Sequence, residues 1–245
     1  MTAPTTLERP AFYALPPGGW RDLLTLLHPP YTAWHLSYVA IGAAVAPTLR
    51  GERLAWTLGA FFLGVGVCAH ALDELHGRPL GTRLSDRALA LLAALALLGA
   101  VAIGVVGAVT VSATIAVLIA AGVFIVLAYN LELFKGRFHT DLWFAAAWGA
   151  FPALTGYWAS SLQLRAEGVL VTAACFMLSL AQRRLSTPVR ELRRRTAAVE
   201  GEQRLLDGRV VALSAARIAA PMEGAMKACA AAMVLLAVGL VLARL

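Results

Sequence analysis

The feature that most constrains this chain is a stretch of 44 residues, 88–131, without one charged side chain. A helix rises 1.5 Å per residue, so this stretch as one helix would be about 66 Å long, roughly twice the hydrocarbon core of a bilayer. It therefore has to fold back on itself, and we expect the turn at Gly104–Ala108. The stretch predicts two membrane-spanning helices joined by almost no loop.

The rest of the chain contains five further apolar stretches of the length that crosses a bilayer, or nearly so. Composition agrees, because 60% of the residues are apolar and 14% are charged, whereas soluble domains are about half apolar and a quarter charged. We predict an all-α polytopic membrane bundle of about seven transmembrane helices. The five further spans are Pro29–Leu49, Leu54–Leu72, Leu142–Leu164, the short Gly168–Gln182, and Ile218–Leu245.

The basic residues predict how the bundle is oriented. With a cytoplasmic N-terminus, sixteen Lys and Arg residues fall on inner segments and four on outer ones, which is the bias of cytoplasmic loops. This bias accounts for the net charge of +7 without a nucleic-acid partner. We therefore expect a multi-pass protein of the cytoplasmic membrane whose partners are the bilayer and a lipid. The oligomeric state stays open.

Four regions follow from this pattern. The third region is basic, and in it Thr187-Pro188 predicts the start of an amphipathic helix that Asp207-Gly208 ends. Such a helix either rests on the anionic inner leaflet or covers a phosphate-bearing substrate. The regions are a cytoplasmic segment 1–28, a core 29–182 of about six spans, the basic cytoplasmic segment 183–217, and a last transmembrane helix 218–245.

Polar side chains gather at the predicted inner ends of the spans, most densely after the second span. On a helix His70 lies three and four residues from Asp73 and Glu74, so the three share one side. With His76 they provide the imidazole and carboxylate groups that bind a divalent cation, and Mg²⁺ fits an oxygen-rich site that also holds phosphate. The alternative is a helix end with solvated charges.

Basic residues after the second and fourth spans are candidates to neutralise a phosphate. Arg78, Lys135 and Arg137 lie there, and an arginine fork binds phosphate bidentately. Lys135 and Arg137 can equally be topology charges at the lipid interface. Tyr129 and Asn130 close the fourth span and are candidates to orient a substrate.

Two further features lie within predicted spans. His28 and His35 are two helical turns apart and therefore share one side. An ionisable residue in a membrane helix is a functional hypothesis by default, although a neutral histidine bonded to a neighbouring helix is an equal alternative for His35. Glu223 and Lys227 are four residues apart and are expected to pair.

In this order the segments resemble the UbiA superfamily of membrane prenyltransferases over residues 20–185. The resemblance implies a substrate with a polyprenyl diphosphate, held by Mg²⁺ on two aspartate-rich motifs and joined to an acceptor, cyclised or hydrolysed. It is carried by Leu27–Pro30, by Arg78–Leu80 with Arg83–Ser85, by Tyr129–Lys135, and by Gly149–Pro152 with Gly156-Tyr157.

The sequence departs from that family at both motifs. The first motif, Asn-x-x-x-Asp-x-x-x-Asp, reads Ala69, Asp73 and Gly77 here. The second is replaced by Gln182–Arg184 and by Arg190-Glu191. The chain also shows two helices fewer than the family's nine. With arginines in place of carboxylates, the site can hold fewer metal ions. This favours a ligand with a single phosphate, which the arginines neutralise.

The leading hypothesis is a divergent UbiA-like enzyme that acts on an isoprenoid phosphate or diphosphate by prenyl transfer or related chemistry. The alternative is a non-catalytic lipid-binding or scaffolding protein on the same fold, and lesser ones are a histidine-based redox enzyme and a transporter. The hypothesis assigns catalysis to Asp73, Glu74, Tyr129 and Asn130, phosphate binding to Arg78, Lys135, Arg137 and Arg190, and Mg²⁺ to His70, Asp73, Glu74 and His76.

Overall fold

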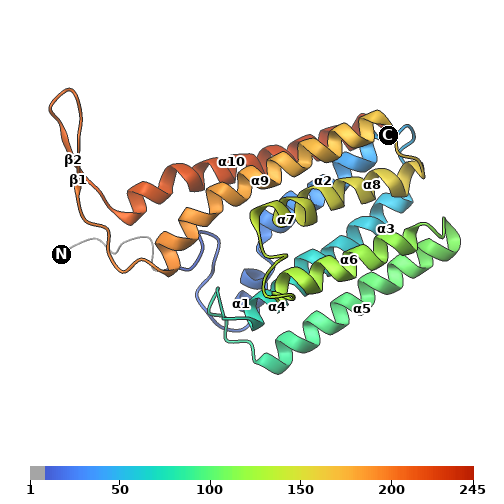
Figure 1. Cartoon of the computed structure of the whole chain (residues 1–245), viewed down its shortest axis with the longest axis horizontal. Coiled ribbons are helices and arrows are strands. Elements are labelled where there is room, and N and C mark those ends of the chain that lie inside the picture. Colours follow the sequence, from blue (N-terminus) through green and yellow to red (C-terminus); the bar gives the residue numbers. More distant parts are fainter. Residues whose placement is uncertain (1–8) are drawn as a thin grey trace.

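The computed structural model describes residues 9–245, which form a bundle of helices with one small hairpin at its end (Figure 1). The elements in chain order are α1 (Trp20–Leu26), α2 (Pro29–Val45), α3 (Gly51–Phe61), η1 (Phe62–Ala69), α4 (His70–Leu75), α5 (Asp86–Thr110), α6 (Ile115–Asn130), α7 (Asp141–Ala145), η2 (Ala146–Ala150), α8 (Phe151–Ser161), α9 (Ala166–Arg194), β1 (Glu202–Arg204), β2 (Val210–Ala212) and α10 (Ala215–Leu242).

Four helices in the described part of the chain are long and apolar enough to cross a membrane. They are the continuous helix Gly51–Leu75 that joins α3, η1 and α4, together with α5, α9 and α10. The other predicted spans are also helical, as α2, as α6, and as the run α7–η2–α8. The prediction of a mostly helical, membrane-type protein is thus confirmed, with four candidate spans.

The fold-back of the long uncharged stretch lies at residues 111–114, and the prediction of a turn at Gly104–Ala108 was wrong. Helix α5 continues to Thr110, and Ser112 and Thr114 bond to each other through their hydroxyls at 2.8 Å in the turn. Gly104 lies against the side chain of Ile119 on α6 instead. This glycine therefore serves helix packing, and the polar residues serve the turn.

Helix α9 runs through Thr187-Pro188, so the prediction that a new helix begins there was wrong. The Thr187 hydroxyl does not cap a helix but donates to the Arg183 carbonyl one turn back, at 2.8 Å. Val189, just after the proline, is buried against Ala219 and Met226 of α10. Packing of α9 on α10 stabilises a helix that the proline alone would end.

The predicted amphipathic helix 188–207 is replaced by the end of α9 and an antiparallel hairpin. Strands β1 and β2 pair with Gln203 opposite Val211, and the hairpin projects away from the bundle (Figure 1). Asp207-Gly208, expected as a helix stop, is the hairpin turn, where Gly208 adopts a φ of 84°. A left-handed glycine suits both a helix end and a hairpin turn, so the dipeptide did not distinguish them.

Helix α2 occupies the middle of the bundle and packs against α8 and α10. Its contact with α8 is backbone to backbone. A Cβ atom at Gly42 would lie 2.0 Å from the Ala153 carbonyl oxygen, and one at Gly156 would lie 2.1 Å from that of Val39. Small residues at these positions let membrane helices approach closely.

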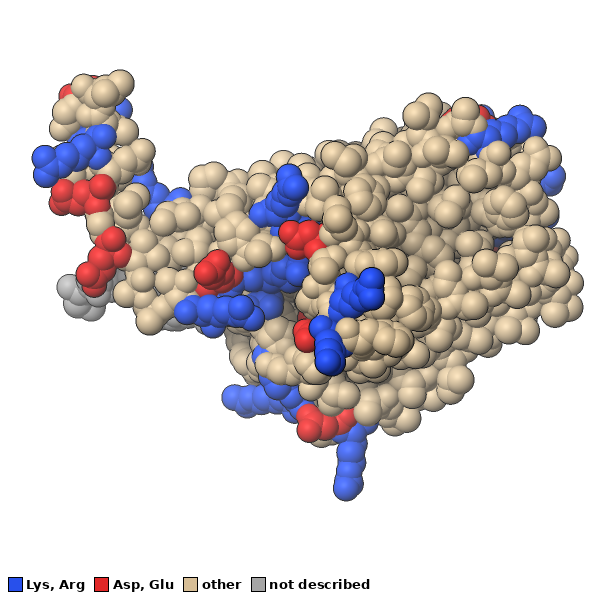
Figure 2. Space-filling model, viewed as in Figure 1, with Lys and Arg blue, Asp and Glu red and all other residues tan. Residues whose placement is uncertain are grey.

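Charged side chains gather on one end of the molecule. Figure 2 shows Lys, Arg, Asp and Glu over the hairpin and the nearby loops, whereas the body of the bundle is almost uncharged on this face. We call this end, made by residues 9–28, 76–85, 131–140 and 183–214, the arginine-rich end. It is the end that the sequence assigned to the inner side.

Candidate functional site

A cavity of about 920 Å³ lies at the arginine-rich end of the bundle. Its volume is at the upper end of the range of small-molecule sites. Residues of α2, η1, α4, α6, α7, η2 and α9 contribute, and all five histidines of the chain line it. The polar lining residues include Tyr13, His28, His35, His70, Asp73, His76, Arg78, Tyr129, Asn130, Glu132, His139, Gln182, Arg183, Arg190, Arg193, Arg194 and Arg195.

One wall of the cavity is a stripe of arginines on α9. Arg183, Arg190 and Arg194 follow one another at spacings of seven and four, which places them on one helix face. Arg183 is paired with Asp141 at 3.0 Å. Among residues 9–245, neither Arg190 nor Arg194 lies within ion-pair distance of a carboxylate, and Arg190 bonds only to Thr187, at 3.3 Å. Two guanidinium groups therefore line the cavity without a carboxylate in contact, and Asp73 on the same cavity acts on both of them only through space.

A run of aromatic groups lies at the cavity mouth. His28 and His70 stack with ring centroids 4.0 Å apart, and the Tyr13 hydroxyl is 2.9 Å from His28 Nδ1. Burial, and then the proximity of His70, Arg194 and Arg190, holds the pKa of His28 well below its usual range. Burial also raises the pKa of Tyr13. This part of the site therefore carries neutral rings beside the cationic wall.

His35 lies deeper in the cavity and bonds to a neighbouring helix. Its Nδ1 is 2.8 Å from the Trp148 carbonyl oxygen of η2. This contact corresponds to the alternative that the sequence left open for His35, a neutral histidine bonded to a neighbouring helix. The expectation that His28 and His35 face one side is confirmed, since both line the cavity.

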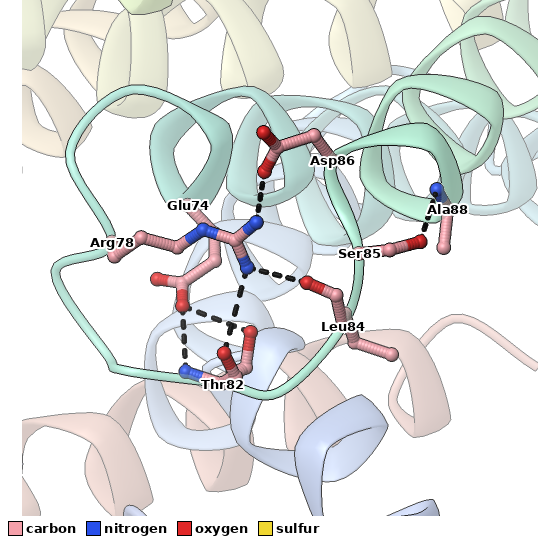
Figure 3. A network of polar contacts seen from close by, with 7 residues as sticks. All are labelled: Glu74, Arg78, Thr82, Leu84, Ser85, Asp86 and Ala88. Carbon is pink, nitrogen blue, oxygen red and sulfur yellow. Dashed lines mark hydrogen bonds and ion pairs between the residues drawn. The ribbon is translucent and has the colours of Figure 1, made fainter.

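Glu74 does not face the cavity, and this corrects its assignment as a catalytic residue and metal ligand. The side chain is fully buried. One carboxylate oxygen accepts from Leu80 N at 2.9 Å. The other accepts from the amide and hydroxyl of Thr82 at 2.8 and 2.9 Å (Figure 3). Glu74 thus holds the loop after α4, and the hydrogen bonds from the amides of that loop fix the direction of the Glu74 side chain.

Arg78 belongs to the same network. Its guanidinium donates to the Leu84 carbonyl at 2.5 Å and pairs with Asp86 (Figure 3). It lines the cavity rim, but its donors are largely occupied within its own loop. Arg78 is therefore a weaker candidate for phosphate than the sequence indicated.

Asp73 lines the cavity, as do His70 and His76. With Glu74 turned away, however, the predicted Mg²⁺ ligands do not form a set. The described residues contain no group of three His, Cys, Asp or Glu side chains able to hold a metal ion. The donor groups present do not fit the metal cluster that the family resemblance implies.

The residues around the end of α6 divide into two groups. Tyr129 and Asn130 are buried and line the cavity; the Tyr129 hydroxyl has no hydrogen-bond partner among the described residues, and the Asn130 amide donates to Val126 O at 2.7 Å. Lys135 and Arg137 are exposed and do not line the cavity. The topology-charge alternative therefore suits the second pair.

Glu223 pairs with Arg193 of α9 at 2.5 Å, so the expected pair with Lys227 was wrong. Lys227 instead lies over the ring of Phe12, 4.8 Å from its centroid. The side chains of the ion pair are 6% and 10% exposed. Because α9 packs on α10, Arg193 lies closer to Glu223 than Lys227 does, although Lys227 is only one turn away on the same helix.

The segment 10–17, which we call the strap, forms the roof of the cavity. Arg193 and Arg194 donate to the carbonyls of Arg9 and Pro10 at 3.0 and 3.2 Å. Ala11 and Ala14 pack on Leu80. The sequence did not indicate the strap, since its proline-rich composition carries no periodic signal. The seven- and four-residue spacing of Arg183, Arg190 and Arg194 was visible but belonged to a segment assigned to two helices.

Comparison with protein-family models, with curated proteins and with solved structures found no match to this chain. The resemblance to the UbiA superfamily therefore remains a prediction from the sequence.

Proposed function

We propose that this protein binds an isoprenoid phosphate or diphosphate in the cavity and acts on it as a divergent UbiA-like membrane enzyme. The observation that carries the proposal is the pair Arg190 and Arg194, which are partly buried and line the cavity without a carboxylate in contact. Partly buried cations of this kind are completed by an anion. The apolar helices behind them match a hydrocarbon chain, and in this proposal the arginine-rich end is cytoplasmic.

The chemistry follows from what these groups do to a phosphate ester. Arg190 and Arg194 stabilise the negative charge that grows on a departing phosphate. The C–O bond to the phosphate breaks, and the allylic cation that remains is captured by an acceptor molecule or loses a proton. Tyr129, which lines the same cavity, stabilises this cation through its aromatic ring. The apolar walls exclude water from that carbon. No part of this proposal requires a metal ion.

A second candidate function is binding without catalysis, as a lipid carrier or scaffold. One observation favours it, because Glu74 is locked in its loop and α4 therefore presents one carboxylate, Asp73, to the cavity. The proposed experiment separates the two functions.

The experiment measures binding and phosphate release with the full chain in lipid nanodiscs. The probes are geranyl phosphate and geranyl diphosphate, with and without a chelator. Arg190→Gln should weaken binding tenfold or more, because a charged hydrogen bond is worth about 1.5–3 kcal/mol. Arg184→Gln should change the Kd by less than about twofold, because Arg184 is exposed and does not line the cavity.

Three outcomes are informative. Release by the wild type that Arg190→Gln and Asp73→Asn abolish establishes the enzyme. Binding that survives the chelator without release establishes the carrier. Absence of binding by either probe, or equal losses in Arg190→Gln and Arg184→Gln, would overturn the phosphate site.

A further inference from the structure

His35 and His70 present their rings to the cavity in one defined tautomer. Nδ1 of His35 lies 2.8 Å from the Trp148 carbonyl oxygen, and Nδ1 of His70 lies 3.1 Å from that of Gly66. A carbonyl oxygen only accepts, so each Nδ1 carries the hydrogen. In the neutral ring Nε2 is then an acceptor. Neither Nε2 has a hydrogen-bond partner within residues 9–245.

A second unsatisfied acceptor lies behind the cavity wall. Gln182 is 3% exposed, and its Oε1 is buried without a partner in the described part of the chain, so this oxygen does not face the cavity. His35 lies seven residues beyond His28, which directly precedes α2. At 1.5 Å per residue it is about 10 Å deeper than the mouth. The cavity therefore has guanidinium donors at its mouth and the Nε2 acceptor of His35 at its deep end.

The cavity wall beside His35 is apolar and includes two aromatic rings. Val65, Phe144 and Trp148 line the cavity beside His35. A buried acceptor without a partner is costly, and a ligand that supplies a donor removes that cost. A site built in this way selects strongly against an analogue that lacks the donor.

We propose that the deep end of the cavity is a subsite for a neutral group with an O–H or N–H donor, which donates to His35 Nε2. The group is a hydroxyl or amine, carried either on the ligand chain about 10 Å from its phosphate or on a second molecule bound with it. Only this distance rests on the proposed function, because the acceptor does not depend on the arginines.

The first test uses benzyl alcohol and ethylbenzene, which have similar shapes and differ in one donor. Both are titrated, at equal mole fraction in the membrane, into full-length protein with ¹⁵N-labelled histidine in nanodiscs. Benzyl alcohol should move the His35 Nε2 signal and bind about tenfold more tightly than ethylbenzene, as about 1.4 kcal/mol gives. His35→Phe should reduce this preference toward one. Gln163→Leu, at the opposite end of the bundle, should leave it intact.

The second test identifies the carrier of the donor. If it lies on the chain, 8-hydroxygeranyl phosphate should bind about tenfold more tightly than geranyl phosphate and displace benzyl alcohol. If it lies on a second molecule, geranyl phosphate and benzyl alcohol should bind together. Equal binding of benzyl alcohol and ethylbenzene, or a preference that persists in His35→Phe, would overturn the subsite. Recognition of benzyl alcohol without binding of geranyl phosphate would overturn the proposed function alone.

Discussion

His28 illustrates how a single residue in this site is controlled by its neighbours. It precedes α2 with a left-handed φ of 46°, stacks on His70 and contacts the strap through Tyr13. Its pKa lies well below the usual value because the ring is buried beside cations. The strap therefore rests on a ring that has to stay neutral.

This low pKa predicts that acid weakens the folded state. The groups facing His28 are Tyr13, Tyr31, His35, His70, Arg190 and Arg194. Below the unfolded pKa of about 6.5, the unfolded chain takes up a proton that folded His28 does not, so the free energy of unfolding falls as pH drops from 7.5 to 5. Asparagine tolerates the left-handed backbone at this position. His28→Asn should therefore show a smaller fall in the free energy of unfolding over this pH range, as measured by chemical denaturation.

The comparison variant is His76→Asn, since His76 is exposed at the helix end. It should retain the wild-type dependence on pH. An equal dependence in wild type and His28→Asn would contradict the role of His28.

At the residue scale the sequence predicted part of the site. Asp73, His70, Tyr129 and Arg190 line the cavity as expected. Glu74 could not be assigned, because its direction is decided by amides of Leu80 and Thr82 that no periodicity describes. Helical spacing predicts which residues share a side, but the loop that follows can turn one of them inward.

At the scale of elements, the contact between α2 and α8 depends on two glycines. Gly156→Ala should destabilise the protein by about 1–3 kcal/mol, because the new methyl would meet the Val39 carbonyl and force the backbones apart. Thermal unfolding in detergent measures the loss. Gly224→Ala on α10 is the control, since no atom lies within 4 Å of its Cβ position, and it should be neutral or stabilising. Similar unfolding temperatures for both variants would refute this account of the packing.

Two π-helical elements also shape the cavity, and the sequence did not predict them. η1 provides Val65 and Ala69, and η2 provides Trp148. Such turns occur inside α-helices, often at functional sites. The helices themselves followed from hydropathy. By contrast, α9 beyond Pro188 depends on its packing against α10, and the exposed hairpin β1–β2 depends on the pairing of its own strands, neither of which hydropathy reports.

For the whole molecule, the unequal distribution of charge predicts the orientation in the membrane. Leu206 at the hairpin is fully exposed at the arginine-rich end, and Gln163 is exposed at the other end. In a background with Cys229→Ala, a membrane-impermeant maleimide on intact cells should label Gln163→Cys and not Leu206→Cys. Permeabilised cells should show both. The reverse pattern would place the arginine-rich end outside.

The strap gives the molecule a property that its cavity alone would not have. Arg194 already donates through Nε to the Pro10 carbonyl of the strap, so a phosphate that takes this donor replaces one acceptor with another. The net gain is the difference between two hydrogen-bonded states, and the free energy of that exchange is far smaller than that of filling an empty site. A protein built in this way releases its ligand readily, because the chain carries the competitor that re-forms the resting state.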